Sequence, residues 1–418
     1  MATPTTARPT SGPAASHHEL RLWRAALVTV FFGAGIAVST WVTRTPAIRD
    51  ALHASTSVMG LVIGGSSVGS IIGITVGSPL VARRGARFVV VAGMSSVVLG
   101  LSVMALGVVV RHSVVVAIGM ALFGYGMGSG EIGNNVSGVE LEASMGRSVI
   151  PGLHGSYSVG TVVGALAGLA ANRVHLPVPL HLVLVAALIA AAAVAWVSRH
   201  VPAATGRVSR TAAATAHERG SEHAPAAPAD ERRFPWLDRR LVGLAVIILG
   251  MALAEVSASD WLPLIVVDGY GSTAAVGSLV FAFFGLAMAI GRLTGGRGID
   301  RFGRAPVMRT TAVLGAIGIA TVVVAPNLWL AAAGVLLWGI GCSLGFPVAL
   351  SAAGEDLRYA AQRAGFVATA GYSAFLIGPP LLGFLGQHIG LRHAIIVVLG
   401  VVLTTLFAAG ATRPRPVA

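Results

Sequence analysis

The strongest constraint on this chain is its series of long apolar stretches, which are separated by short polar segments. Each stretch has about 20 residues, enough for one α-helix to cross the ~30 Å hydrocarbon core of a bilayer. Because a segment inside lipid must satisfy its own backbone hydrogen bonds, we predict a transmembrane helix for each. The predicted spans are residues 23–43, 57–80, 88–110, 114–138, 151–171, 177–197, 241–264, 274–297, 306–325, 328–350, 364–386 and 391–410.

Composition supports an all-α integral membrane protein. Charged residues make up 11% of the 418 positions, whereas a soluble domain has about 25%. The sequence contains no phosphate-binding glycine loop after a strand, no nucleophile elbow and no histidine cluster with metal-ligand spacing. We therefore predict neither an enzyme nor a cofactor. The single cysteine, Cys342, excludes a disulfide within the chain.

The spans form two sets of six, separated by a polar segment rich in Arg, Ala, Pro, Glu and His. The N-terminal residues lack the apolar middle of a signal peptide, so we predict a disordered tail there. Along the chain we predict a cytoplasmic tail at 1–22, a six-helix bundle at 23–197, a cytoplasmic linker at 198–240, a second six-helix bundle at 241–410 and a cytoplasmic tail at 411–418.

The formal net charge of +13 has two explanations, nucleic-acid binding and the excess of basic residues in cytoplasmic loops of membrane proteins. All 29 basic residues are arginines, and 24 of them, including the cluster from Arg292 to Arg309, lie inside if both termini are cytoplasmic. This distribution favours the second explanation. We predict a monomeric, multi-pass protein of a bacterial plasma membrane that contacts lipid and no nucleic acid.

The two halves share sequence features at similar offsets. The arginine-glycine segment Arg83–Arg87 is echoed by Asp300–Arg304, with Gly303 218 positions after Gly85, and Tyr157-Ser158 is followed 215 positions later by Tyr372-Ser373. Similar offsets at two separate places predict a duplicated six-helix unit, as is common in transporters.

The segment Gly296–Arg304 has the pattern G-x-x-x-D-R-x-G-R and lies between the eighth and ninth predicted spans. It resembles a cytoplasmic loop of the major facilitator superfamily, and the resemblance covers about residues 20–410. It implies two pseudo-symmetric six-helix bundles with a solute site between them, near mid-membrane, and rocking of one bundle on the other.

In that family the loop latches the outward-facing state through its aspartate, which pairs with arginines or a helix terminus. The resemblance assigns this latch to Asp300, Arg301, Gly303 and Arg304. The N-terminal copy keeps Arg84 and Gly85 but has Ala82 at the position of the aspartate. We therefore expect a different or weaker latch in that half.

Longer segments resemble a bacterial branch of the superfamily that includes rhizopine transporters. They are Trp41–Pro46, Asn135–Glu140, His154–Ser158 and Glu255 with Asp260-Trp261. The fourth span also resembles that of the fucose–proton symporters, which use a glutamate there for sugar binding and proton coupling. This second resemblance implies such a role for Glu131 only.

Glu131 is an ionisable residue inside the apolar fourth span, where a charge costs about 2.5 kcal/mol or more. Burial disfavours the charged form of a carboxylate, so such a group can take and release a proton near neutral pH. Helical spacing places Gly124, Gly128, Glu131, Asn135 and Gly138 on one face, with Asn134 beside it. We predict that this face lines a cavity with room for a solute. The alternative is that Glu131 and Asn135 only hydrogen-bond a neighbouring helix.

Glu255 lies in the middle of the seventh span, with Ser259 one turn later. We expect it to bind substrate, carry a proton or pair with an arginine. Asp260 is nearer the outer end, where a solvated or gating role is expected.

Three residues of the first six-helix bundle are further candidates for substrate binding or proton coupling. Arg44 ends the first span, where it would pair with a carboxylate when the outside closes or extend to the outer headgroups. Trp41 has the position of an interfacial tryptophan. His154 opens the fifth span, either as a proton relay, given its reference pKa of ~6.5, or as a packing residue.

Charged residues also mark the inner ends of spans four and ten. Glu140, Glu142 and Arg147 lie in the first half, and Glu355, Asp356, Arg358 and Arg363 lie in the second. We expect cytoplasmic salt-bridge latches there, and a solvated loop is the alternative.

These features favour a secondary transporter that couples protons to a small polar solute, sugar-like or cyclitol-like. Isolated acidic residues suit protons, and no oxygen-rich cage for a metal cation is evident. Proton-driven efflux of amphipathic drugs is the main alternative, although the fifth span lacks the Gly-Pro pair of drug–proton antiporters. A non-transporting receptor or assembly factor is a third possibility.

Overall fold

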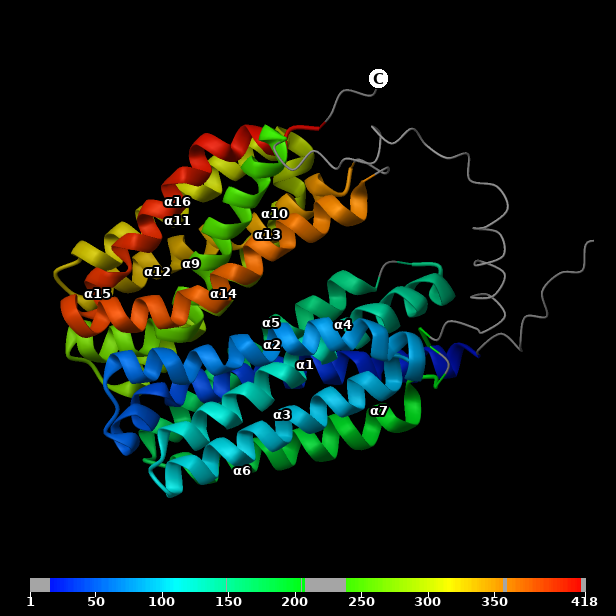
Figure 1. Cartoon of the computed structure of the whole chain (residues 1–418), viewed down its shortest axis with the longest axis horizontal. Helices are drawn as coiled ribbons and strands as arrows, with labels where there is room; N and C mark the ends of the chain where they lie inside the picture. Colours follow the sequence, from blue (N-terminus) through cyan, green and yellow to red (C-terminus); the bar gives the residue numbers. More distant parts are fainter. Residues whose placement is uncertain (1–15, 148, 204, 207–237, 356–358, 415–418) are drawn as a thin grey trace, which may run out of the picture.

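The computed structural model describes residues 16–414 except 148, 204, 207–237 and 356–358. The predicted tails and linker lie largely outside the described residues, as do Asp356 and Arg358. The helices (Figure 1) are α1 (His17–Leu52), α2 (Thr56–Arg84), α3 (Ala86–Val109), α4 (Ser113–Met145), α5 (Ile150–Arg173), α6 (Val178–Ile189), η1 (Ala190–Val194), α7 (Ala195–His200), α9 (Arg239–Tyr270), α10 (Ala274–Phe302), α11 (Arg304–Val324), α12 (Leu328–Cys342), α13 (Gly345–Ala353), α14 (Ala360–Ile389), α15 (Leu391–Ala394), α16 (Ile396–Ala408) and η3 (Ala409–Thr412).

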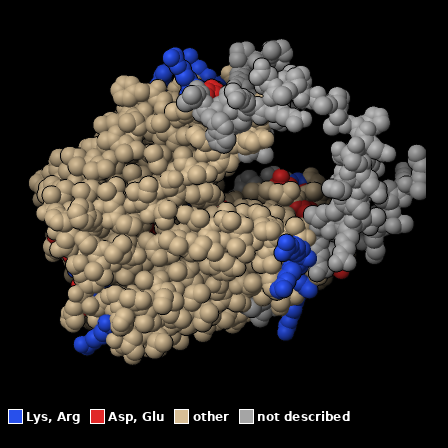
Figure 2. All heavy atoms as spheres, viewed as in Figure 1, with Lys and Arg blue, Asp and Glu red and all other residues tan. Residues whose placement is uncertain are grey.

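Within the described residues, 11 helical segments are long and apolar enough to cross a membrane. Three of them join shorter helices: α6 to α7, α12 to α13, and α15 to η3. The predicted fifth span corresponds to α5, which is not among these 11 segments. α5 is 24 residues long and carries the polar run His154–Ser158. Figure 2 shows charged side chains near the ends of the molecule and a broad uncharged belt between them on the face drawn. The prediction of an all-α membrane fold is confirmed.

The duplication predicted from the sequence appears in the backbone. Gly85 joins α2 to α3 with φ 88° and ψ 159°, and Gly303 joins α10 to α11 with φ 83° and ψ 162°. Each glycine N–H donates to the carbonyl four residues earlier at 2.8 Å. A residue with a Cβ is strained at such positive φ values. Ser55 and Thr273, also 218 positions apart, cap α2 and α10 by accepting a backbone N–H at 3.3 Å each.

The bundles are held together internally by small residues at helix contacts. A Cβ at Gly124 of α4 would overlap the Ser66 carbonyl of α2, and one at Gly69 of α2 would overlap the Ala121 carbonyl of α4. Such close approach is how membrane helices gain packing energy without a hydrophobic driving force. It fixes α4 against α2 and thereby sets which side chains of α4 face the space between the bundles.

The two bundles meet at one end of the molecule and separate at the other. α2 packs on α14, and α5 packs on α10. A Cβ at Gly60 would lie 2.7 Å from the Pro379 carbonyl oxygen, and one at Gly383 would lie 2.7 Å from the Gly60 Cα. At the end where the described chain begins and ends, the bundles diverge (Figure 1), and Figure 2 shows a hollow between them. We call the closed end the outer end and the open end the inner end, after the orientation predicted from the sequence.

Candidate functional site

Five titratable side chains meet between the bundles, each from near the middle of its helix: Tyr157 (α5), Glu131 (α4), Glu255 (α9), Arg292 (α10) and Tyr372 (α14). Tyr157 is within electrostatic range of Glu255, Arg292 and Glu131, and Tyr372 is within range of Glu131. The site therefore draws on both bundles.

Glu255 and Arg292 form an ion pair with an Nη2–Oε1 distance of 2.8 Å. The side chains remain 24% and 36% exposed, so both stay accessible from the space between the bundles. The prediction that Arg292 belongs to the cytoplasmic loop cluster is wrong, because its side chain pairs with Glu255 of α9, near the middle of both helices. The sequence did contain an indication of this position, since Arg292 falls inside the predicted span 274–297.

A small cavity of ≈ 50 Å³ adjoins this ion pair. Its polar walls come from Tyr157, Ser158, Thr161, Ser259 and the ion pair itself, and its apolar walls include Phe281, Phe284 and Met288. That volume has room for a few water molecules. Ser259, one turn after Glu255, is thus on the same wall, as its spacing predicted.

Glu131 lies among protein atoms on most sides, yet its side chain is exposed to the space between the bundles. No hydrogen bond or ion pair joins it to another described residue. The two tyrosines near it, Tyr157 and Tyr372, are the pair that recurs at an offset of 215. The sequence showed their repetition but gave no reason to place them beside Glu131.

The other polar and glycine residues of α4 have different surroundings. Asn134 is 5% exposed and its Oδ1 has no partner in the described part of the chain, whereas Asn135 is half-buried. Gly124 and Gly128 abut the backbone of α2 at Ser66 and Ser70. The prediction that these glycines leave room for a solute is wrong, because the neighbouring helix fills that room.

Arg44 and Trp41 are more deeply placed than the sequence suggested. Arg44 is 3% exposed and donates to Asn172 Oδ1 at 2.5 Å and to the Leu176 carbonyl. It does not extend to the headgroups, and no carboxylate in the described part of the chain pairs with it. Trp41 is 5% exposed and packs edge-on against Phe123 at a centroid distance of 6.4 Å, so it is not interfacial. Both corrections follow from the tight packing of α1 inside its bundle.

His154 lies beside the site, whereas Asp260 is a second acidic residue of α9 that the sequence singled out. His154 is exposed, contacts the ring of Phe31 at a centroid distance of 5.0 Å and lies within electrostatic range of Arg292. Asp260 is only 7% exposed, so the solvated role expected for it is wrong.

The outer end is closed by polar contacts between the bundles. Arg49 of α1 pairs with Asp268 of α9 and also with its own neighbour Asp50. Asn172 of α5 donates to Ser278 Oγ of α10 at 3.0 Å. The sequence gave no signal for Asn172, which is uncharged and follows the end of the predicted fifth span.

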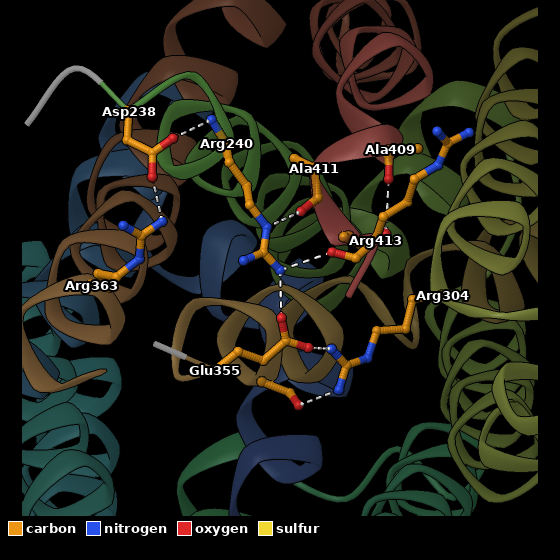
Figure 3. Close-up of polar contacts among 10 residues, drawn as sticks. Asp238, Arg240, Arg304, Glu355, Arg363, Ala409, Ala411 and Arg413 are labelled. Atoms are coloured by element: carbon orange, nitrogen blue, oxygen red, sulfur yellow. Dashed lines mark hydrogen bonds and ion pairs between the residues drawn. The ribbon is translucent and has the colours of Figure 1, made fainter. Parts of the chain in front are cut away.

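The inner end of the C-terminal bundle carries a charged cluster (Figure 3). Glu355 accepts hydrogen bonds from Arg304 and from Arg240, the latter at 2.6 Å, while Asp238 pairs with Arg363 at 2.6 Å. Burial raises the pKa of the Glu355 carboxyl, but the hydrogen bonds and charges of its two arginines outweigh this and lower it. Every residue labelled in Figure 3 lies at position 238 or later, so this cluster tightens one bundle and does not bridge two.

The remaining gating candidates make local contacts in this state. Glu140 accepts from the Gly206 N–H at 2.6 Å, and Glu142 accepts from the Val149 N–H at 2.6 Å. The guanidinium group of Arg84 lies over the ring of Phe88, four residues later, and that of Arg301 lies over the ring of the adjacent Phe302. Asp300 and Arg147 have no hydrogen-bond or ion-pair partner within the described residues. No latch joins the bundles at this end among those residues, as expected where the two separate.

Comparison with known proteins adds the family context. The family model described as Major Facilitator Superfamily matches residues 25–374 and 262–418. The uncharacterized transporter y4wD of Sinorhizobium fredii is 30% identical over 88% of this chain and 95% of its own length. The membrane protein MosC of Rhizobium meliloti is 24% identical over 89% of this chain and 85% of its own length.

Solved structures share the fold. The nucleoside transporter NupG superposes with a TM-score of 0.69 at 13% identity, covering 93% of this chain and 98% of its own. A single-residue variant of the fucose–proton symporter FucP of E. coli gives a TM-score of 0.59 at 16% identity, covering 94% of this chain and 98% of its own.

Proposed function

Because the chain belongs to the Major Facilitator Superfamily, we propose that it carries a small, hydroxylated solute, sugar-like or cyclitol-like, by alternating access coupled to protons. Members of this family are transporters and not enzymes. The proposal adds a solute class, a coupling ion and a site to that shared activity.

The observation that carries the proposal is the unpaired carboxylate of Glu131 facing the space between the bundles. It lies within electrostatic range of two phenols, one from each bundle. An ionised carboxylate at this depth is costly unless it is hydrated or paired. Protonation removes that cost, so Glu131 is suited to be neutral in one state of the cycle and charged in another.

The surrounding groups suit a solute with several hydroxyls. The tyrosine hydroxyls, Ser259 and the ion pair Glu255–Arg292 provide donors and acceptors on opposite walls. Asn134 and Asn135 of α4 and His154 of α5 add polar groups on the N-terminal side. FucP is a fucose–proton symporter and NupG a nucleoside transporter by their names, and both solutes are hydroxylated. Their fold likeness supports the class of solute proposed here and no single compound.

The gating that we propose follows from the open inner end. When the bundles close there, Asp300, now unpaired, is placed to meet a positive group or helix terminus across the gap, with Arg301, Gly303 and Arg304 shaping its loop. Residues Arg84, Gly85, Glu140 and Arg147 form the corresponding rim of the N-terminal bundle. We further propose a monomer in a bacterial plasma membrane, with both termini and the linker in the cytoplasm, in keeping with the arginine distribution.

The test is solute-driven proton flux in proteoliposomes with an internal pH-sensitive dye. A panel of sugars, cyclitols and cationic drugs is added to wild type, to Glu131→Gln and to a matched control, Glu19→Gln. Glu19 closes a capping box with Ser16 at the start of α1, and glutamine preserves such a box. Sugar-driven proton movement that is lost only in Glu131→Gln supports the proposal. Unchanged coupling in Glu131→Gln contradicts the role of Glu131 and directs attention to Glu255.

A second candidate, proton-driven efflux of amphipathic compounds, is favoured by the apolar wall of the cavity, which includes Phe281, Phe284 and Met288. The same panel separates the two, because efflux predicts proton movement with the cationic drugs and none with the sugars. Absence of flux with every compound would favour a receptor or assembly role.

A further inference from the structure

A second cavity lies at the closed outer end, away from the central site. Its volume is ≈ 360 Å³, and its walls come from α1, from the connection between α5 and α6, and from the start of α10. The lining includes Arg44, Asn172, His175, Val178, Thr273 and Ala275. None of its lining residues is an aspartate or glutamate.

Arg44 brings a full positive charge to this cavity without a matching negative one. It is 3% exposed, and its two hydrogen-bond partners, Asn172 Oδ1 and the Leu176 carbonyl, are both neutral. Its Nε is buried and has no acceptor among the described residues. Buried charges in proteins are ordinarily paired or bind an ion, because removing a charge from water is costly. The guanidinium therefore lacks a counter-ion among the residues that the structure describes.

Two helix N-termini point positive ends at the same cavity. Thr273 caps α10 by accepting from the Val276 N–H, which leaves the N–H groups of Ala274 and Ala275 without an acceptor in the described residues. At the start of α6, Pro177 provides no side-chain cap, so the Val178 N–H is open as well. Free N–H groups and the helix dipole make such termini favourable for anions.

We propose that this cavity binds one small oxyanion, a carboxylate or a phosphate, between Arg44 and the N-termini of α6 and α10. Arg44 and α6 belong to the N-terminal bundle and α10 to the C-terminal bundle, so the complete site exists only while the outer end is closed. Binding there stabilises the outward-closed state, because a ligand favours the state for which it has the higher affinity. The proposal is independent of what the central site transports.

Binding is measured by isothermal titration of sodium phosphate, and separately of sodium acetate, into the full-length protein in nanodiscs of zwitterionic lipid. Ionic strength is held constant. Wild type is expected to bind one anion per chain at saturation. Arg44→Gln is expected to weaken binding at least about tenfold, because hydrogen bonds to charged groups contribute about 1.5–3 kcal/mol. Arg111→Gln, which removes an exposed positive charge from the same outer end, is expected to bind as wild type does.

A second variant tests the same proposal if Arg44→Gln does not fold. Ala275→Phe fills the cavity from the α10 side while leaving every hydrogen bond of Arg44 in place. It is expected to lose anion binding and to keep its thermal unfolding midpoint in the absence of phosphate. Equal anion binding by wild type and Ala275→Phe, or no saturable binding of either anion by wild type, overturns the proposal.

The source of the phosphate is distinguished with a second set of nanodiscs that contain phosphatidylglycerol. Phosphate affinity that falls in these nanodiscs assigns the site to a lipid headgroup, and unchanged affinity assigns it to a soluble anion. The conformational part is tested by the distance between spin labels at His112 and Pro326, on the outer loops of the two bundles, in a Cys342→Ser background. Saturating phosphate is expected to enrich the short, outward-closed distance, and an unchanged distribution contradicts that part.

Discussion

The contact between Gly60 and Gly383 offers the sharpest test of the outward-closed arrangement. An added Cβ at Gly383 would lie 2.7 Å from the Gly60 Cα and 2.9 Å from the Thr56 carbonyl oxygen. Both atoms are backbone, so no side chain can rotate away to make room. The substitution Gly383→Ala can be accommodated only if α2 and α14 move apart, which opens the outer end.

The size of the effect follows from this geometry. Carbon atoms in contact prefer about 3.5–4.0 Å, so the helices must separate by roughly 1 Å locally. Overpacking of this kind costs about 1–3 kcal/mol. If the outward-open state lacks the contact, the cost falls on the closed state alone, and the open-to-closed ratio rises about 5- to 150-fold.

The assay is the same spin-label pair, His112 and Pro326, with Gly365→Ala as the matched control. Gly365 lies on the same helix, and a Cβ there meets nothing within 4 Å, so both variants gain the same helix propensity of about 1 kcal/mol. Gly383→Ala should populate a longer distance than wild type, and Gly365→Ala should not. If both variants fold and give the wild-type distribution, the reasoning about the closed end is refuted.

Three further outcomes follow. Gly85→Ala and Gly303→Ala should each lower the free energy of unfolding by about 1–3 kcal/mol because of their positive φ, and their effects should add in the double variant since the sites are far apart; strong non-additivity in denaturation would contradict independent loops. Trp23→Phe removes the 2.8 Å hydrogen bond from its indole to Ser137 and should lower the free energy of unfolding by about 1–3 kcal/mol. An unchanged thermal unfolding midpoint would contradict this expectation. The pKa of Glu355 is lowered in the folded state, so its stabilising effect is present at neutral pH and is lost as the pH falls through that lowered value. The difference in unfolding midpoint between wild type and Glu355→Gln should therefore shrink in acid. A difference that grows in acid would contradict the ion-pair explanation.

The fold was accessible from the sequence because two of its determinants are local. Apolar length specifies a membrane helix whatever its neighbours, and the glycine turns at Gly85 and Gly303 repeat as a short pattern. Helix boundaries shifted outward, since the helices extend beyond the lipid: α1 begins at His17, before the apolar run at 23–43. Polar residues flanking an apolar run continue a helix as readily as they end it.

The site was predicted less completely because its partners come from different helices. Glu131 and Glu255 stand out as charges in apolar runs, so the sequence of its own helix was enough to identify each as a candidate. Arg292 was assigned to a loop because arginines follow it closely in the chain. Tyr157 and Tyr372 carry no charge and are indistinguishable by sequence from ordinary core tyrosines. Which side chains share a cavity depends on how six-helix bundles pack, and periodicity within one helix does not contain that information.

The position of Arg49 between two aspartates bears on what opening of the outer end would break. Asp50 and Asp268 occupy matching places in the two halves of the duplicated chain, and Arg49 pairs with both at once. Asp50 and Arg49 are neighbours on α1, whereas Asp268 lies on α9 of the other bundle. Separation of the bundles would therefore remove one carboxylate from the guanidinium and leave the other beside it.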